Sequence, residues 1–164
     1  MTKVYITDRI DNPNIEKNIL GDALVQDISN DISILLVWHQ EITGDYLSLF
    51  PGVKHIIRYG VGYDKVDLAE CKKRNITVSN NPAYCIEEVS ATATAMILNI
   101  ARGTSEYDAA SKFYYNSWQE NAMTKLRRNS EITVGIIGAG NIGSWTMRNC
   151  QAIGFKTLFY DPYL

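Results

Sequence analysis

The sequence predicts an α/β protein built around a parallel sheet. Short apolar segments alternate with amphipathic ones along most of the 164 residues, and this alternation is typical of strand–helix–strand units. Ile32–Trp38 is apolar throughout, as expected for a parallel strand that is buried on both faces. Near the end of the chain, a glycine-rich segment lies between an apolar segment and a helical one. This order predicts a second, nucleotide-binding unit.

The first hundred residues contain the expected elements of the sheet. Strands are expected at 3–7, 23–28, 32–38, 53–59 and 76–80, and helices at 14–20, 44–50 and 65–75. Asn80-Asn81-Pro82 breaks the chain, and the longest helix is expected from about Ile86 to Ala101, where apolar residues recur at helical spacing.

A polar and aromatic segment, 104–129, follows this helix. Its aromatic residues include Tyr107, Phe113, Tyr114, Tyr115 and Trp118. The segment is too polar for a core and too aromatic for a plain linker. We therefore expect a helical arm that rests on another domain or on a second subunit.

Composition excludes several classes of protein. The net charge of −2 gives no reason to expect nucleic acid or an anionic membrane as a partner. The N-terminus lacks the apolar region of a signal peptide, and no segment has the ~20 apolar residues of a membrane span. Cys71, Cys85 and Cys150 are widely spaced, so neither a metal site nor a disulfide framework is expected. These features favour a cytoplasmic location.

The segment VGIIGAGNIG carries the pattern G-x-G-x-x-G at Gly138, Gly140 and Gly143. The first glycine permits a tight turn, the second lets the backbone approach a pyrophosphate, and the third lets helix and strand pack closely. Free N–H groups near Asn141 and Ile142 would face the phosphates at the start of the helix. The alternative is a strand–helix turn that merely favours glycine.

Asp161 ends the next apolar segment, 18 residues after Gly143. An acid at this spacing can accept hydrogen bonds from the adenosine ribose hydroxyls, which favours NAD, and it would repel a 2′-phosphate. Strand, turn, helix, strand and acid therefore predict the first βαβ unit of a Rossmann domain. The alternative is that Asp161 belongs to an ordinary Asp-Pro turn.

The sequence resembles the D-isomer-specific 2-hydroxyacid dehydrogenases in three ordered stretches, Ile56–Asp67, Asn80–Arg102 and Thr133–Pro162. The resemblance implies a flavodoxin-like parallel-sheet substrate domain at 1–100, with a crossover helix to about 102. A helical arm and an incomplete NAD-binding Rossmann domain would occupy 103–164. It also implies NAD as cofactor, a small 2-keto or 2-hydroxy acid as substrate, and a homodimer.

The resemblance assigns Gly60, Val61 and Gly62 to a loop whose N–H groups hold the substrate carboxylate. Exposed backbone donors flanked by glycine suit a carboxylate, although an ordinary turn is the alternative. The crossover helix departs from the family pattern, because Val89-Ser90-Ala91-Thr92-Ala93 lacks the acid and histidine found there. Any contact of this helix with the nicotinamide is therefore in question.

We expect no catalytic residue within this chain, because the Arg, Glu and His implied by the resemblance fall downstream of Leu164. Structural or surface roles are expected for His39 and His55, and no family role transfers to Arg58. The chain is thus expected to be the N-terminal part of a longer dehydrogenase, or to be covered by a partner chain. It should be inactive alone and bind NAD weakly. The alternative function is a non-catalytic, corepressor-like NAD-binding protein of the same fold.

Overall fold

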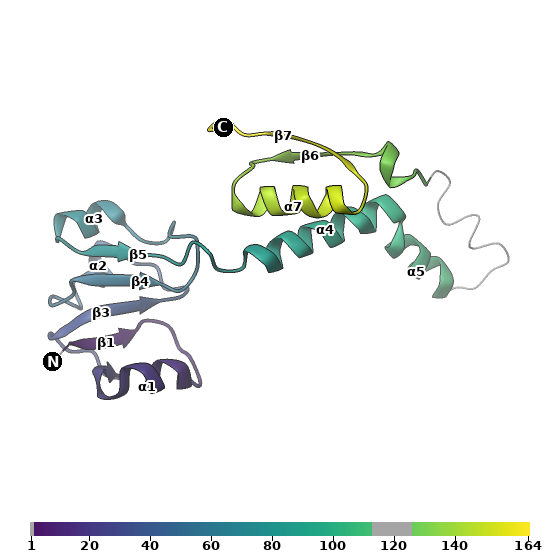
Figure 1. Ribbon diagram of the computed structural model, residues 1–164. Helices are drawn as coiled ribbons and strands as arrows, with labels where there is room; N and C mark the ends of the chain where they lie inside the picture. Colours follow the sequence, from purple (N-terminus) through teal and green to yellow (C-terminus); the bar gives the residue numbers. More distant parts are fainter. Residues whose placement is uncertain (1, 113–125) are drawn as a thin grey trace. The chain divides into compact units, whose positions relative to one another are not determined.

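A computed structural model of the chain describes residues 2–112 and 126–164. Their contacts divide the protein into two compact units, Met1–Tyr84 and Cys85–Leu164. Figure 1 shows a sheet with flanking helices in the first unit, and a strand pair with helices in the second. Each unit is described by itself.

The first unit is a parallel sheet of five strands in the order β2-β1-β3-β4-β5. The strands are β1 (Lys3–Ile6), β2 (Leu24–Val25), β3 (Ile32–Val37), β4 (His55–Arg58) and β5 (Thr77–Ser79). Its helices are α1 (Asn14–Leu20), the 3₁₀ helix η1 (Gly21–Ala23), α2 (Gly44–Leu47) and α3 (Leu68–Lys73). Because all strands run in parallel, the loops that follow them leave from one edge of the sheet.

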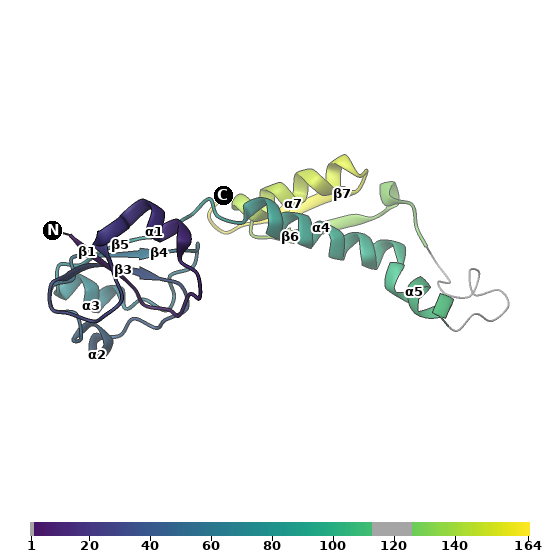
Figure 2. The same ribbon diagram turned by 90° about the horizontal axis from the view of Figure 1, so that it is seen from below.

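The core of the first unit lies between the sheet and helices α2 and α3. Side chains from β3 and β4 pack there against Leu47 and Phe50 around α2 and against Cys71 of α3. In Figure 2, α2 and α3 lie on one side of the sheet and α1 on the other. Thr43 and Asp67 begin α2 and α3 by accepting hydrogen bonds from the N–H groups of the first turn, as capping residues do.

The second unit contains a parallel pair of strands, β6 (Thr133–Ile137) and β7 (Lys156–Tyr160). Its helices are α4 (Ile86–Arg102), α5 (Thr104–Lys112), the 3₁₀ helix η2 (Asn129–Glu131) and α7 (Asn141–Ala152). Helix α7 lies between the strand pair and α4, which packs along it (Figure 1). Gly103, with a φ of 61°, ends α4 in the left-handed conformation that favours glycine.

One face of the β6–β7 pair carries exposed apolar side chains. Ile137 is 91% exposed, Leu158 59% and Tyr160 67%. Thr157, by contrast, faces α7 and accepts a hydrogen bond of 2.8 Å from the side chain of Gln151. Because successive strand residues point to opposite faces, α7 covers one face of the pair, and the exposed residues belong to the other.

The predicted α/β fold class with a parallel sheet is confirmed, while several elements are shorter than expected. β2 has two residues instead of six because it pairs only with β1, at the edge of the sheet. The helix expected at 44–50 ends at Leu47. Of the predicted arm, α5 is helical, whereas Phe113, Tyr114, Tyr115 and Trp118 lie outside the described residues. The predicted domain boundary near residue 100 stays a prediction.

Candidate functional site

The loop Gly60-Val61-Gly62 begins one residue after the end of β4, at the edge where the parallel strands end. Gly60 is buried, Gly62 is exposed and Val61 is 37% exposed. In open α/β sheets, ligands bind at this edge. The structure therefore places the predicted carboxylate loop where a ligand can reach it.

The carbonyl groups of this loop are engaged by residues that follow β5. The side-chain amide of Asn80 donates 2.8 Å to the carbonyl oxygen of Val61, and the N–H of Asn81 donates 3.2 Å to that of Gly60. Within residues 2–112 and 126–164, the N–H groups of the three loop residues donate to no protein acceptor. Successive unpaired N–H groups of this kind form a site for an anion.

Arg58 lies directly beneath the loop. A Cβ placed on Gly60 would come within 2.8 Å of its Nη1 atom, and Nη1 is buried with no hydrogen-bond partner in the described part of the chain. A guanidinium group here adds positive charge next to the N–H donors, and both favour a carboxylate. Sequence reasoning gave Arg58 no role.

Asp8 orders the loop that follows β3 at the same edge of the sheet. Its carboxylate accepts hydrogen bonds from the N–H groups of Trp38 (2.7 Å), His39 (2.6 Å) and Gln40 (2.9 Å). Burial acts to raise the pKa of Asp8, but these bonds and one from the Thr7 hydroxyl outweigh it, so the pKa lies below its ordinary value. Sequence reasoning missed Asp8, although its position directly after an apolar strand was a usable signal.

Both histidines contact neighbouring side chains. The ring of His39 stacks on Trp38 with 4.4 Å between ring centroids. Nδ1 of His55 lies 2.5 Å from Oγ1 of Thr77, and its Nε2 lies 3.1 Å from Oγ of Ser79.

In the second unit, the glycine-rich turn joins β6 to α7. Gly138 has a φ of 88°, which only glycine adopts readily. A Cβ on Gly143 would lie 1.9 Å from the carbonyl oxygen of Gly138, whereas a Cβ on Gly140 would meet nothing within 4 Å. Gly138 and Gly143 thus build the turn, and Gly140 leaves open space above it.

The start of α7 presents unpaired N–H groups. The first helical bond at this end runs from the N–H of Ser144 to the carbonyl of Gly140. Among the described residues, the N–H groups of Asn141, Ile142 and Gly143 donate to no acceptor. Such a helix start attracts phosphate through its free donors and its dipole, as the sequence predicts for this position.

Asp161 follows β7 and reaches the centre of the glycine-rich turn. Its Oδ2 accepts 2.8 Å from the N–H of Ala139, and its Oδ1 accepts 2.9 Å from the N–H of Tyr163. The structure therefore brings together the residues predicted to bind the cofactor. Each carboxylate oxygen has further acceptor capacity, so a ribose hydroxyl can still be bound.

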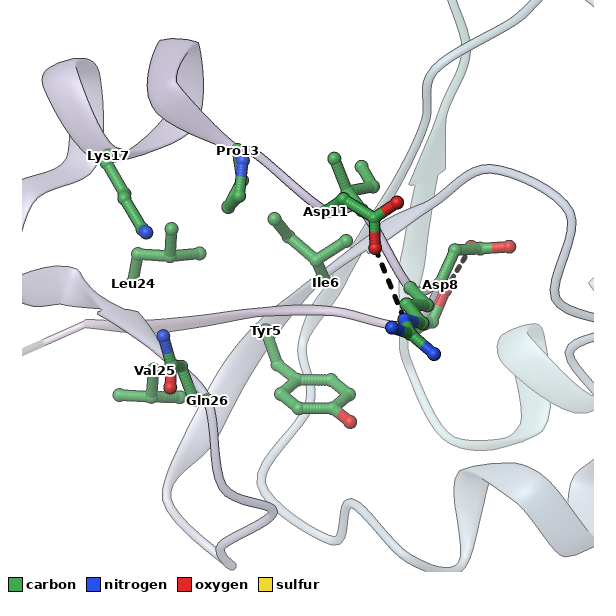
Figure 3. Close-up of a pocket in the computed structure, with 12 residues that line it drawn as sticks. Tyr5, Ile6, Asp8, Asp11, Pro13, Lys17, Leu24, Val25 and Gln26 are labelled. Atoms are coloured by element: carbon green, nitrogen blue, oxygen red, sulfur yellow. Dashed lines mark hydrogen bonds and ion pairs between the residues drawn. The ribbon is translucent and has the colours of Figure 1, made fainter.

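A separate hollow of about 510 Å³ lies beside the end of β1 (Figure 3). Its lining comes from β1 and the segment after it, from α1, and from β2. Arg9 and Asp11, which both line it, form an ion pair of 3.3 Å. The residues predicted to bind substrate or cofactor lie elsewhere.

The described residues contain no group of three or more His, Cys, Asp or Glu side chains that could hold a metal ion. They also contain no helix that is both long and apolar enough to cross a membrane.

The chain is similar to known proteins both in sequence and in structure. D-lactate dehydrogenase of Staphylococcus aureus (strain MSSA476) is 32% identical over 149 residues, which cover 90% of this chain and 44% of that protein. A crystal structure of D-lactate dehydrogenase from Aquifex aeolicus, complexed with NAD and lactic acid, has 28% identity and a TM-score of 0.76 over 98% of this chain and 51% of that one. A protein from Thermus thermophilus, 21% identical, shares the fold over 98% of this chain and 58% of its own with a TM-score of 0.80.

This chain thus spans about half the length of the relatives it matches. The family match covers most of this chain, from residue 2 to residue 153. On this match, the chain belongs to the D-isomer specific 2-hydroxyacid dehydrogenases, through the catalytic domain of that family.

Proposed function

We propose that the chain is the substrate-binding part and the first cofactor-binding part of an NAD-dependent D-2-hydroxyacid dehydrogenase. The observation that carries this proposal is the glycine-rich turn, with Asp161 bound to Ala139 at its centre. Family membership and the free N–H groups of Gly60–Gly62 support the same assignment. The reaction would interconvert a small 2-hydroxy acid and its 2-keto acid.

The residues present fit a dinucleotide. The N–H groups of Asn141, Ile142 and Gly143 would hold the pyrophosphate, and Gly140 leaves the space it needs. Asp161 would accept the ribose hydroxyls, and its charge disfavours a 2′-phosphate, hence NAD rather than NADP. When bound, the nicotinamide supplies hydride exchange with C2 of the substrate.

In the first unit, the residues around β4 would bind the substrate carboxylate. The N–H groups of Gly60, Val61 and Gly62 would donate to its oxygens, and Arg58 would add positive charge below the loop. These groups bind and orient the substrate. Proton transfer from the hydroxyl needs a base, and we assign that role to no residue of this chain. We therefore propose that the 164 residues alone have no dehydrogenase activity.

The binding roles can be tested by titrating NAD⁺ and oxamate, a small carboxylate, into the ¹⁵N-labelled chain. NAD⁺ should shift the amide signals of 138–143, with a dissociation constant weaker than low micromolar, and NADP⁺ should bind less well. Oxamate should shift the signals of Gly60–Gly62. The assignment fails if neither ligand perturbs these amides. Turnover of NADH with glyoxylate, hydroxypyruvate or pyruvate would contradict the proposed inactivity.

We also propose a homodimer, or a partner chain, that covers the exposed face of the β6–β7 pair. The exposed side chains of Ile137, Leu158 and Tyr160 support this, because apolar patches of this kind mark interaction surfaces. Sedimentation velocity should show association. A monomer of 18.5 kDa that melts cooperatively would overturn this proposal.

A further inference from the structure

We propose that Asn80 is a positioning residue that aims the N–H of Gly62, in the Gly60-Val61-Gly62 loop, at the substrate carboxylate. This inference rests on the proposed role of the loop and adds a residue to it. Asn80 itself would not touch the substrate. Its side-chain amide instead holds the carbonyl oxygen of Val61 at 2.8 Å.

The sheet brings Asn80 to the loop. β4 and β5 are neighbours, with Ile57 in register with Ser79. Asn80 comes directly after β5, and the loop follows β4 by one residue. The two segments therefore leave the same edge of the sheet side by side, although about 20 residues of chain separate them.

The hydrogen bonds to the loop fix the directions of two donors. A peptide group is planar, and in the trans form its N–H points opposite to its C=O; the described residues contain no cis peptide bond. The carbonyl of Val61 shares a peptide group with the N–H of Gly62, so the bond from Asn80 directs that N–H away from Asn80. The bond from the Asn81 N–H to the Gly60 carbonyl does the same for the N–H of Val61.

Two consecutive N–H groups are thus oriented before any ligand arrives. Glycine on both sides of Val61 would otherwise leave the loop many conformations, and ordering it on binding would weaken affinity. Asn80 is half-buried, whereas Val61 and Gly62 are exposed. The residues that carry the donors are therefore open to a ligand, while the residue that orients one of them is partly covered.

The neighbouring residue provides a matched control. Asn80 acts through its side chain, while Asn81 acts through its backbone N–H. Asn80→Ala removes the positioning bond, whereas Asn81→Ala removes the same side chain one residue later and keeps its bond to Gly60. Asn80→Asp and Asn81→Asp form a second pair, in which both variants add one negative charge but only the first loses a donor to Val61.

The experiment measures oxamate binding to the ¹⁵N-labelled 164-residue chain. Asn80→Ala should weaken binding by roughly three- to tenfold, the net effect of one hydrogen bond, and Asn81→Ala should leave it within twofold. Asn80→Asp should weaken binding more than Asn81→Asp. The proposal is overturned if Asn80→Ala binds oxamate like the unmodified chain, or if both alanine variants weaken binding equally.

A measurement without ligand separates positioning from binding. The ¹⁵N relaxation of the Gly62 amide should show greater motion in Asn80→Ala than in Asn81→Ala. The thermal unfolding midpoints of the two variants should agree within a few degrees. If oxamate does not bind to the unmodified chain, the proposed function of the loop is wrong. The motion of the Gly62 amide then still tests whether Asn80 positions the loop. Unchanged relaxation in Asn80→Ala would contradict the positioning role.

Discussion

The backbone N–H of Ala139 donates a 2.8 Å hydrogen bond to Oδ2 of Asp161. This bond joins the middle of the glycine-rich turn to the end of β7, and Oδ1 of the same carboxylate also accepts the N–H of Tyr163. Asp161 thus stabilises the turn in addition to its proposed role toward the ribose. Its substitution should affect both the cofactor preference and the local structure.

Asp161→Asn should reduce discrimination between the two cofactors. The variant keeps the size of the side chain and one carbonyl acceptor, but it loses the negative charge that repels a 2′-phosphate. We expect the ratio of the NADP⁺ to the NAD⁺ dissociation constant to fall by about tenfold, measured by amide-shift titration. Glu131→Gln, which removes an exposed charge from the same unit, should leave the ratio unchanged. An unaltered ratio in Asp161→Asn would show that its charge does not select the cofactor.

Gly143→Ala should reduce stability, whereas Gly140→Ala should reduce cofactor binding. A methyl group on Gly143 would clash with the backbone of Gly138, at 1.9 Å from its oxygen, and should lower the free energy of unfolding by about 1–3 kcal/mol. A methyl group on Gly140 meets open space, so stability should stay within about 0.5 kcal/mol. It would, however, occupy the proposed place of the pyrophosphate.

Urea unfolding followed by circular dichroism measures the first effect, and NAD⁺ titration measures the second. Equal stability of the two variants would contradict the close contact of Gly143 with Gly138. Undiminished NAD⁺ binding by Gly140→Ala would contradict the assigned position of the pyrophosphate.

Asp8 should make the stability of the protein depend on pH. Because the pKa of Asp8 lies below its ordinary value, the folded state favours the carboxylate. Its contribution is therefore fully present above the ordinary pKa of about 4 and is lost as the pH falls through the lowered value. Asp8→Asn should lower the free energy of unfolding by about 1–3 kcal/mol at pH 7, and by less near pH 3.

The matched control is Asp11→Asn, which removes an exposed carboxylate from the same segment. Urea unfolding between pH 3 and pH 7 compares the two variants with the unmodified chain. A constant difference between Asp8→Asn and the unmodified chain across this range would show that the carboxylate form of Asp8 is not what the fold stabilises.

Thr94 should contribute to the packing of α4 on α7. Its buried hydroxyl donates 2.7 Å to the carbonyl of Ser90 and accepts 3.3 Å from the side-chain amide of Asn149. Thr94→Val keeps the shape but removes the acceptor, and should cost about 0.5–1.5 kcal/mol of stability. Thr92→Val is the control, because the exposed Thr92 hydroxyl donates only within its own helix, to Glu88. Equal losses would mean that the bond to Asn149 adds nothing.

Local sequence patterns predicted most of the elements and the residues of the proposed cofactor site. The Gly60–Gly62 loop was assigned through the family resemblance, and Arg58 was given no role. The glycine-rich turn was predictable because its requirements are local: a left-handed φ at Gly138 and no side chain at Gly143. Asp161 was predictable from its spacing. Its bond to Ala139 was not, because no sequence pattern specifies which backbone group a carboxylate will accept.

Asp8 and Asn80 were missed for a related reason. Asn80 directly follows β5, and Asp8 comes one residue after the end of β1. Each side chain binds a loop that is distant in the sequence, through backbone N–H or C=O groups that every residue carries. The partner residues therefore leave no signature of their own. The available signal was the position of a polar residue at the carboxyl end of a parallel strand, where the functional loops of such sheets gather.

The position of β1 inside its sheet has a practical consequence for protein production. β1 is hydrogen-bonded on one side to β2 and on the other to β3, although it begins at the third residue of the chain. Loss of residues 3–6 would remove the strand that joins β2 to the rest of the sheet, and β2 would keep no hydrogen-bonded neighbour in it. A variant for protein production should therefore keep these four residues and leave them free to enter the sheet.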